Sequence, residues 1–346
     1  MFIVIVKKNH LYLMITFCIA TVLFLGLELL YFKIANKYNI VDKPNQRSSH
    51  TYSTIRGGGI IFPLAFITGI LIFQPQNIWV AVAVLAISFI SFMDDVVTLN
   101  NITRISIHFL AVILVIYQCD LNFPQIQEYI NQNQTVILVG LSLATLIVCI
   151  GIINACNFMD GINGITVLYF TATLASIWYI QNSLSIVILV NGVWQLLMGA
   201  LFVFGFFNLR KKAKTFAGDV GSISVALIIC FLILSLIAYT KNPKWILLLG
   251  VYGLDTVFTI ISRLFRSENI FEAHRSHFYQ YLANQRKMNH ILISVLYAFT
   301  QLVVNYFLWF EKTGLFATVF FFGVVIIYCL VRFWFEGFKA LFKKQV

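Results

Sequence analysis

Long runs of apolar residues, separated by short polar segments, dominate this chain. A helix that crosses the ~30 Å hydrocarbon core of a bilayer needs about 17–25 predominantly apolar residues. Runs that approach or exceed this length cover 11–32, 58–73, 77–93, 104–118, 135–153, 163–181, 184–208, 221–239, 244–263, 290–310 and 315–335. The pattern therefore predicts an all-α, polytopic membrane protein with about eleven transmembrane helices, in which residues 1–346 form a single integral membrane domain.

The composition supports lipid, rather than water, as the main solvent of the chain. Of 346 residues, 60% are hydrophobic and 11% are charged, whereas soluble domains are roughly 45–50% apolar and about 25% charged. A formal net charge of +11 would suggest nucleic-acid binding in a soluble protein. Here the basic residues lie between apolar runs, and no basic stripe with interleaved aromatic residues occurs, so we expect no nucleic-acid partner.

The cysteines and the first apolar run exclude two further interpretations. The six cysteines are scattered and form no CxxC pair, so the sequence supports neither a disulfide framework nor a zinc site. The first run extends from Leu11 to about Tyr31, which is too long for the h-region of a secretory signal peptide. We therefore expect a retained first helix.

The distribution of Lys and Arg predicts the orientation of the chain in the membrane. Five of the 24 basic residues fall on one side, namely Lys7, Lys8, Lys241, Lys244 and Lys312. The others fall in or beside the loops 33–57, 94–104, 154–162, 209–220 and 264–289 and the carboxyl-terminal tail. Because cytoplasmic loops carry the excess of Lys and Arg, we expect these loops and the carboxyl terminus in the cytoplasm, and the amino terminus outside.

Two polar clusters in these loops combine carboxylates with a helix end. The pair Asp94-Asp95, with Asn100 and Arg104 nearby, requires a cation or a proton between its carboxylates, although ordinary helix-end charges are an alternative. The sequence Gly-Asp-Val-Gly-Ser, which contains Asp219, opens an apolar run. A helix amino terminus there would favour an anion, unless Asp219 is simply an N-cap.

The segment 154–164 concentrates amide and carboxylate groups. Asn154, Asn157, Asp160 and Asn163 supply oxygen ligands and hydrogen-bond donors. Two glycines spaced three residues apart in this segment allow a tight turn and a close approach of the backbone to a ligand. A plain polar turn between two spans is the alternative interpretation.

The longest cytoplasmic loop carries two histidines that flank an arginine. His274, Arg275 and His277 offer several donors to a phosphate group. A zinc site is a weak alternative, since the spacing is i, i+3 and no thiol accompanies the histidines. Two upstream groups are further candidates: the segment 42–47 with His50, and the triple glycine that follows Arg56, which is not a P-loop because no Gly-Lys-Ser/Thr follows.

Ionisable residues within the spans are a default indication of function, because they are costly at membrane depth. Asp255 and Arg263 lie eight residues apart, a little over two helical turns, and therefore on roughly one face. We expect a buried structural role for Asp255 and assign none to Glu28 or His108. Taken together, the clusters of carboxylates, Asn, His and Arg on one side of the membrane predict a site for Mg²⁺ and phosphate groups.

In their order along the chain, these motifs resemble those of the polyprenyl-phosphate N-acetylhexosamine-1-phosphate transferases. That family includes the enzymes that start O-antigen and teichoic acid linkage units and the phospho-MurNAc-pentapeptide translocase. The similar segments are 42–50, 56–59, 94–100, 154–164, 218–222, 255–263 and 272–280. The resemblance thus extends over nearly the whole chain.

The resemblance implies ten or eleven helices with an active-site cleft that faces the cytoplasm from the bacterial inner membrane. It implies transfer of an N-acetylhexosamine 1-phosphate from a UDP-N-acetylhexosamine to undecaprenyl phosphate, with release of UMP. Mg²⁺ would be the cofactor, with Mn²⁺ as an alternative. The two substrates and the surrounding membrane lipids would be the partners, and a homodimer is left open.

The resemblance also implies roles for individual residues. Asp219 resembles the Mg²⁺ ligand and Asp94 the base that deprotonates the lipid phosphate, while Asp95 and Asn157 would shape the metal and phosphate site. Asp160 would help to hold the nucleotide. The expected substrate-binding residues are Lys43, Arg47, His50, Gly58, Asn100, Asn154, Asn157, Asn163, His274, Arg275 and His277.

Two departures from the family pattern bear on the sugar. Asn163 stands where many members carry the second Asp of Asp-Gly-x-Asp-Gly, so that carboxylate is absent. The sequence His-Arg-Ser-His, which begins at His274, is most similar to the branch that initiates O-antigen or other cell-envelope polysaccharides, often with a 6-deoxy-N-acetylhexosamine. The sugar, GlcNAc or a 6-deoxy-N-acetylhexosamine, is left open, and a pentapeptide translocase is not expected.

Two rival functions fit the sequence less well. A transporter would carry polar residues through the depth of several spans and often has repeated halves. Here the polar clusters lie at one surface and only Asp255 is clearly deeper. A non-catalytic membrane scaffold leaves the phosphate-suited clusters in one orientation without explanation.

Overall fold

A computed structural model of the chain describes residues 2–44, 49, 52–97, 99–124, 126–132, 134–270, 272, 274–310 and 315–343. The helices are α1 (Phe2–Tyr38), α2 (Ile61–Phe73), α3 (Ile78–Val96), α4 (Asn101–Asn122), α5 (Ile126–Asn131), α6 (Thr135–Phe158), α7 (Ile165–Ser183), α8 (Asn191–Asn208), α9 (Gly218–Thr240), α10 (Gly250–Phe265), α11 (Phe278–Asn284), α12 (His290–Phe310), α13 (Leu315–Glu336) and α14 (Phe338–Phe342). Three 3₁₀ helices, η1 (Gly58–Ile60), η2 (Pro75–Asn77) and η3 (Pro243–Leu249), extend α2, α3 and α10 at their amino-terminal ends. The strands β1 (Val41–Asp42) and β2 (Thr54–Ile55) form a small antiparallel pair.

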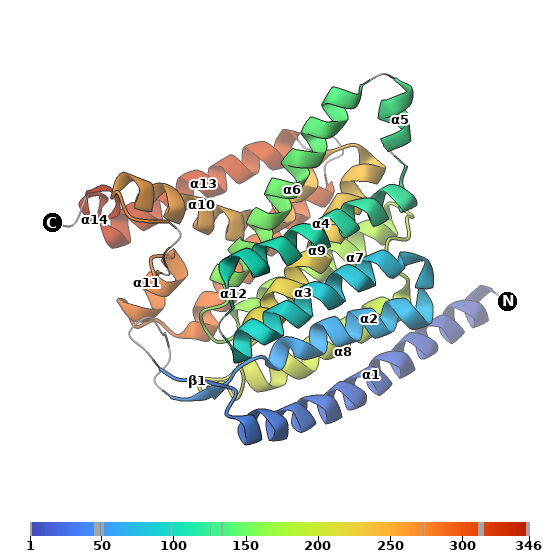
Figure 1. Ribbon diagram of the computed structural model, residues 1–346, viewed down its shortest axis with the longest axis horizontal. Coiled ribbons are helices and arrows are strands. Elements are labelled where there is room, and N and C mark those ends of the chain that lie inside the picture. The colour runs from blue at the N-terminus through green and yellow to red at the C-terminus, as the bar shows by residue number, and fades with distance from the viewer. Residues whose placement is uncertain are drawn as a thin grey trace.

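The protein is an all-α, polytopic membrane protein in which the long helices run side by side (Figure 1). Among the described residues, nine helices are long and apolar enough to cross a membrane. The shorter apolar helix Gly58–Phe73 and the 19-residue helix α7 occupy two further places where the sequence predicts spans. Each predicted apolar run therefore coincides with a helix, because a chain in lipid must satisfy its backbone groups within each helix.

One boundary predicted from the sequence is wrong. The run 184–208 was expected to be one helix, but α8 begins only at Asn191. The residues before it are non-helical, and two glutamine side chains replace the missing helical hydrogen bonds. Gln74 donates to Ile188 O at 2.8 Å and accepts from Val190 N, while Gln181 donates to Leu189 O at 3.0 Å. Irregular backbone among membrane helices is tolerated where protein groups satisfy it in this way.

Helix α9 lies at the centre of the bundle. It is apolar around its whole circumference, which is typical of a buried helix, and 89% of its most apolar window is buried. It packs against α2, α3, α4, α6 and α7. Its first turn, at Gly218 and Asp219, lies at the end of the bundle that carries the candidate site.

The three consecutive glycines at positions 57–59 join the amino-terminal part of the chain to the start of α9 by hydrogen bonds. Gly58 N donates to Phe216 O at 2.9 Å and Gly59 N donates to Ala217 O at 3.1 Å. A Cβ atom on Gly59 would lie 2.5 Å from Gly221 Cα, a distance that no side chain tolerates. Glycine at this position therefore allows the two backbones to touch, and the contact places the preceding residue, Arg56, beside α9.

Helices α6, α10 and α13 contact the segment 274–279, which we name the histidine loop and whose last two residues begin α11. Figure 1 shows α11 and β1 at one end of the bundle, with α13 and α14 beside α10. Most residues of α13 are exposed or half-buried, and only Ala317 and Arg332 are buried among its described residues. The histidine loop thus lies between the central helices and a peripheral one.

Candidate active site

Two arginines join three carboxylates where α9 begins. Arg56 Nε lies 2.6 Å from Asp95 Oδ1, and Arg56 Nη2 donates to Asp219 Oδ1 at 3.2 Å. Arg104 Nη1 lies 2.9 Å from Asp94 Oδ2, and Arg104 Nη2 donates to Asp219 Oδ2 at 3.2 Å. Each oxygen of Asp219 therefore faces one arginine. The formal charges of this cluster leave one negative charge in excess, which favours a further cation.

Asp95 caps the central helix from a neighbouring one. Its side chain is fully buried, and its two oxygens accept hydrogen bonds from Asp219 N and Val220 N, each at 3.0 Å. These N–H groups belong to the first turn of α9 and have no partner within the helix. Asp219 lies in that turn and does not cap it. The N-cap interpretation of Asp219 is therefore wrong, and its carboxylate is directed to the arginines.

The segment 154–164 approaches the same helix end through Asn157. Ser222 Oγ of α9 donates to Asn157 Oδ1 at 3.0 Å. Asp160, in the turn after α6, accepts a short hydrogen bond from the hydroxyl of Thr166. Burial raises the pKa of Asp160 to about 6, against the lowering effect of the Thr166 hydroxyl. Asn154 donates only to Ile150 O in its own helix, at 2.9 Å.

Asn163 joins two loops. Its amide Nδ2 donates to Arg210 O at 2.8 Å and to Lys211 O at 3.2 Å. Its side chain is directed to the backbone of the segment after α8, and its main-chain carbonyl oxygen accepts a hydrogen bond from Ser294 Oγ at 2.9 Å. A carboxylate at this position has no N–H to donate to those carbonyls, which gives a structural reason for an amide here.

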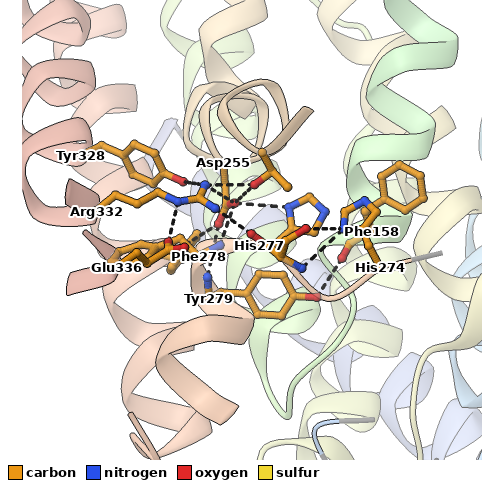
Figure 2. Close-up of polar contacts among 12 residues, drawn as sticks. Phe158, Asp255, His274, His277, Phe278, Tyr279, Tyr328, Arg332 and Glu336 are labelled. Atoms are coloured by element: carbon orange, nitrogen blue, oxygen red, sulfur yellow. Dashed lines mark hydrogen bonds and ion pairs between the residues drawn. The ribbon is translucent and has the colours of Figure 1, made fainter. Parts of the chain in front are cut away.

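Asp255 of α10 organises the histidine loop through several polar contacts, as Figure 2 shows. The fully buried carboxylate accepts from Phe278 N at 3.1 Å, from Tyr279 N at 3.4 Å and from Tyr297 OH at 2.6 Å. His277 Nδ1 lies 3.3 Å from Asp255 Oδ1. The carboxylate thus fixes both the backbone of the loop and one nitrogen of its buried histidine.

The rings of the histidine loop form a short stack against α6. His274 and His277 are stacked with their centroids 5.0 Å apart, and Phe158 lies 5.9 Å from His274. Tyr279 OH donates to Phe158 O at 2.8 Å, which joins the loop to the turn that contains Asp160. Burial lowers the pKa of His274 to about 3, and His277 and Arg263 act in the same direction. His274 is therefore a neutral hydrogen-bonding group at physiological pH.

The structure places the remaining predicted residues in different surroundings. Asn100 caps α4, where its Oδ1 accepts from Ile102 N at 3.0 Å. Gly58 is buried, and a Cβ there would meet Thr215. Lys43 and Arg275 are exposed. Arg47 and His50 lie outside the described residues.

Sequence reasoning left out several residues that the tertiary structure brings into the site. Arg56 and Arg104 stood inside recognised motifs but were not selected, although they hold Asp219. Arg332, near the end of the last predicted span, is fully buried beside the histidine loop. The available signal was an arginine inside an apolar run. Asp255 and Arg263 have separate partners, since Arg263 Nε pairs with Glu268 at 3.0 Å.

The residues near Asp219 fit Mg²⁺ in the kind of donor that they offer. Carboxylate and amide oxygens, as in Asp219, Asp95 and Asn157, are the ligands that Mg²⁺ prefers. Among the described residues, however, no group of three or more His, Cys, Asp or Glu side chains is arranged to hold a metal ion. In this arrangement Arg56 and Arg104 lie between the carboxylates, where a shared cation would neutralise them.

Fold and site together define a polytopic membrane protein whose carboxylates and arginines gather at one end of the bundle, a site suited to anionic ligands. Residues 77–237 match the family model described as glycosyl transferase family 4. This match covers 161 of the 346 residues, and over this part the chain is similar to the family. The matched range contains the Asp94–Asp95 pair, the segment 154–164 and Asp219, and it ends before Asp255 and the histidine loop.

Two curated relatives illustrate the similarity. The "Probable undecaprenyl-phosphate N-acetylglucosaminyl 1-phosphate transferase" of Bacillus subtilis is 25% identical over 276 residues, which cover 77% of this chain and 75% of that protein. The "Phospho-N-acetylmuramoyl-pentapeptide-transferase" of Streptococcus mutans is 35% identical over 112 residues, which cover 31% of this chain and 30% of that enzyme. The similarity to the second protein thus spans less than a third of its length.

Proposed function

We propose that this protein transfers an N-acetylhexosamine 1-phosphate from a UDP-N-acetylhexosamine to undecaprenyl phosphate and releases UMP. The observation that carries the proposal is Asp219, held between Arg56 and Arg104 at the start of the central helix. The match of residues 77–237 to the model of glycosyl transferase family 4 supports the reaction class. The name of the Bacillus subtilis relative supports undecaprenyl phosphate as the acceptor and a sugar 1-phosphate as the transferred group.

The main physical obstacle to this reaction is charge, since one phosphate anion must attack another. An oxygen of the lipid phosphate would attack the sugar-bearing phosphorus of the donor. The bond from that phosphorus to the bridging oxygen would then break, and UMP would leave with the bond's electron pair. Arg56 and Arg104 offer fixed positive charges, and the start of α9 adds the positive end of its helix dipole.

We assign roles to the carboxylates by position. Asp94 accepts from Leu99 N at 2.8 Å and pairs with Arg104, and it would act as the base that keeps the lipid phosphate fully ionised. Asp95 would hold the first turn of α9 and Arg56 in place. Asp160 would help to bind the nucleotide. The attack is direct in this proposal, whereas a phosphoryl-aspartate intermediate would require an acidic nucleophile.

Mg²⁺ fits the proposed site as the divalent cofactor, with Mn²⁺ as an alternative. Asp219 would hold it, with Asp95 and Asn157 contributing oxygens to the metal and phosphate site. A divalent cation held there would neutralise negative charge on the donor diphosphate. Since Asp219 pairs with the arginines at 3.2 Å, and Asp95 and Asp94 pair with them at 2.6 and 2.9 Å, we infer that the Asp219 contacts yield first.

The location of the reaction follows from the charge distribution. The loops that carry the site also carry most of the Lys and Arg residues, which supports a site that faces the cytoplasm. We infer the bacterial inner membrane, eleven spans, an external amino terminus and an active-site cleft open to the cytoplasm. The remaining substrate contacts would come from Lys43, Arg47, His50, Gly58, Asn100, Asn154, Asn163, His274, Arg275 and His277.

The sugar and pathway are the finer part of the proposal. The sequence His-Arg-Ser-His in the histidine loop supports a donor that carries GlcNAc or a 6-deoxy-N-acetylhexosamine. The product, a lipid-linked diphosphate sugar, would then initiate O-antigen or another cell-envelope polysaccharide. A homodimer is compatible with this function and is not required by it.

Release of UMP by the purified protein tests the proposal. The assay supplies undecaprenyl phosphate, Mg²⁺ and one UDP-N-acetylhexosamine at a time, with omission of lipid or metal as controls. We expect release that needs both, and loss of about a hundredfold or more in the variant Asp219→Asn, as for other electrostatic catalytic groups. Failure of well-folded protein to release UMP from any donor would contradict the proposed reaction.

A further inference from the structure

Arg332 is an unusual residue for the helix that carries it. Helix α13 is apolar, and only 11% of its most apolar window is buried. Arg332 is nevertheless 1% exposed, and the only other buried residue among the described part of the helix is Ala317. A helix that lies mainly against lipid gains nothing from a buried charge, which is costly in a membrane protein. The arginine therefore requires a specific explanation.

The guanidinium group is directed at the histidine loop and at its buried support. Arg332 Nη2 donates to Ser276 O at 2.6 Å, inside the loop. Nη1 donates to Thr259 Oγ1 at 3.0 Å and lies 3.8 Å from Asp255 Oδ1. Nε donates to Glu336 Oε1 at 2.6 Å, one turn further along α13. Figure 2 shows Arg332 on one side of Asp255 and His277 on the other.

Aromatic rings lie against the guanidinium group, and further hydrogen bonds join the end of α13 to α11 and the residues after it. Its guanidinium carbon lies 4.8 Å from the ring centroid of Phe258 and 5.9 Å from that of Phe278, which are cation–π distances. Phe335 O, near the end of α13, accepts from Tyr281 OH at 2.6 Å and from Arg286 Nη2 at 2.7 Å. The end of α13 is therefore hydrogen-bonded to both the histidine loop and α11.

One ring nitrogen of His277, the histidine that this network holds, has no hydrogen-bond partner among the described residues. His277 Nδ1 faces Asp255, while His277 Nε2 is buried and has no hydrogen-bond partner. An unsatisfied buried polar atom is rare in folded proteins and requires an explanation. A ligand that enters beside the stacked ring of His274 would supply one.

We propose that Arg332 is a positioning residue of the active site, so that the peripheral helix α13 sets the histidine loop for the phosphates of the donor. Arg332 fixes Ser276 and Asp255, and Asp255 fixes His277 and the backbone of the loop. The identity of the ligand as a UDP-sugar rests on the proposed function, but the positioning of the loop by Arg332 does not.

The planar shape of the guanidinium group distinguishes this role from simple anchoring. Membrane helices associate through packing of small and apolar residues, so an apolar side chain would serve to dock α13. Contacts in three directions, to Ser276, Thr259 and Glu336, use the fixed fork of an arginine. A lysine would retain the charge without that geometry, and Arg332→Lys should therefore restore only part of the function.

The test compares Arg332→Met and Arg332→Lys with the matched control Leu330→Ala, in full-length protein in nanodiscs. Leu330 lies on the same helix and is 62% exposed. Hydrogen–deuterium exchange reports the amides of Phe278 and Tyr279, which donate to Asp255. UMP-release kinetics report the KM of the UDP-sugar and of undecaprenyl phosphate separately. Glu336→Gln is a milder variant in case Arg332→Met does not fold.

We expect faster amide exchange in the histidine loop of Arg332→Met, and kcat/KM for the donor lowered about tenfold to a hundredfold, since small displacements of positioned groups have effects of this size. The KM of the lipid acceptor and all values for Leu330→Ala should stay near those of the unaltered protein, and Arg332→Lys should be intermediate. Glu336→Gln should show the same pattern with a smaller change.

Two results would overturn the positioning role. One is unchanged exchange and unchanged donor kinetics in a folded Arg332→Met or Glu336→Gln variant. The other is faster exchange with unchanged donor kinetics, which would make Arg332 an anchor only. Absence of UMP release in the unaltered protein would instead refute the proposed function, and exchange would then decide by itself whether Arg332 holds the loop.

Discussion

Asp95 and Asp219 are two carboxylates of one cluster, but the structure predicts losses of stability of very different size when each is replaced by asparagine. Asp95→Asn and Asp219→Asn each remove one negative charge and keep nearly the same shape. Asp95 is fully buried, whereas the side chain of Asp219 is 15% exposed. We expect Asp95→Asn to lower the free energy of unfolding strongly, and Asp219→Asn to lower it little.

The expected loss in the free energy of unfolding for Asp95→Asn follows from the three partners of the Asp95 carboxylate. The carboxylate accepts from two N–H groups of the first turn of α9 and lies 2.6 Å from Arg56 Nε. An asparagine presents one NH₂ group to these donors, so one of them loses its acceptor and Arg56 loses its closest counter-charge. Removal of one partner from a buried ion pair costs about 3–5 kcal/mol, and we expect a loss of stability in this range.

The magnitude for Asp219→Asn is smaller because the arginines keep other partners. Arg56 retains Asp95 at 2.6 Å, and Arg104 retains Asp94 at 2.9 Å. The change removes the excess negative charge of the cluster, and one of two hydrogen bonds at 3.2 Å survives. Loss of a single hydrogen bond costs about 0.5–1.5 kcal/mol, which sets the expected effect.

Reversible unfolding in mixed micelles, titrated with SDS and followed by tryptophan fluorescence, measures both differences. The assay should rank the unaltered protein close to Asp219→Asn, and both well above Asp95→Asn. Equal losses in the two variants, or a larger loss for Asp219→Asn, would refute the argument that Asp95 supports the helix while Asp219 is held for a ligand. Conversely, UMP release should fail in Asp219→Asn while its fold remains intact.

Two further changes test the local structure around the site. Gly59→Ala should lower the free energy of unfolding by about 3 kcal/mol or more through overpacking, because the added Cβ would lie 2.5 Å from Gly221 Cα. Gly151→Ala is the matched control in the same unfolding assay, because no atom lies within 4 Å of its added Cβ. Asn163→Asp should lower the free energy of unfolding by about 1–3 kcal/mol, because the carbonyls of Arg210 and Lys211 lose their hydrogen-bond donor. The preference among UDP-sugars in the UMP-release assay should not change. A switched preference would mean that residue 163 selects the sugar.

Much of the fold was predictable from the sequence. Each apolar run coincides with a helix, because in lipid a helix satisfies its own backbone groups and hydrophobicity by itself marks the segment. The exception, the start of α8, depends on Gln74 and Gln181, which supply hydrogen bonds from distant positions. The local sequence around residues 184–190 could not predict these hydrogen-bond partners.

The candidate site was predictable as a set of residue types, but its connections were not. The clusters around Asp94, Asn157 and Asp219 stand out because polar residues are rare in this chain, and the structure brings them to one end of α9. Which carboxylate caps the helix and which one faces the arginines could not be read from the sequence. That difference is decided by the packing of α3 against α9, more than a hundred residues apart.

The sequence alone thus determined which segments form apolar helices and which polar residues remain for chemistry, since hydrophobicity and helical periodicity act over one or two turns. Only the tertiary structure decided that Arg332 of α13 reaches Ser276 and that Asp255 pairs with His277 instead of Arg263. Periodicity fixes neighbours within one helix, whereas the partner of a buried charge depends on which other helix packs against it.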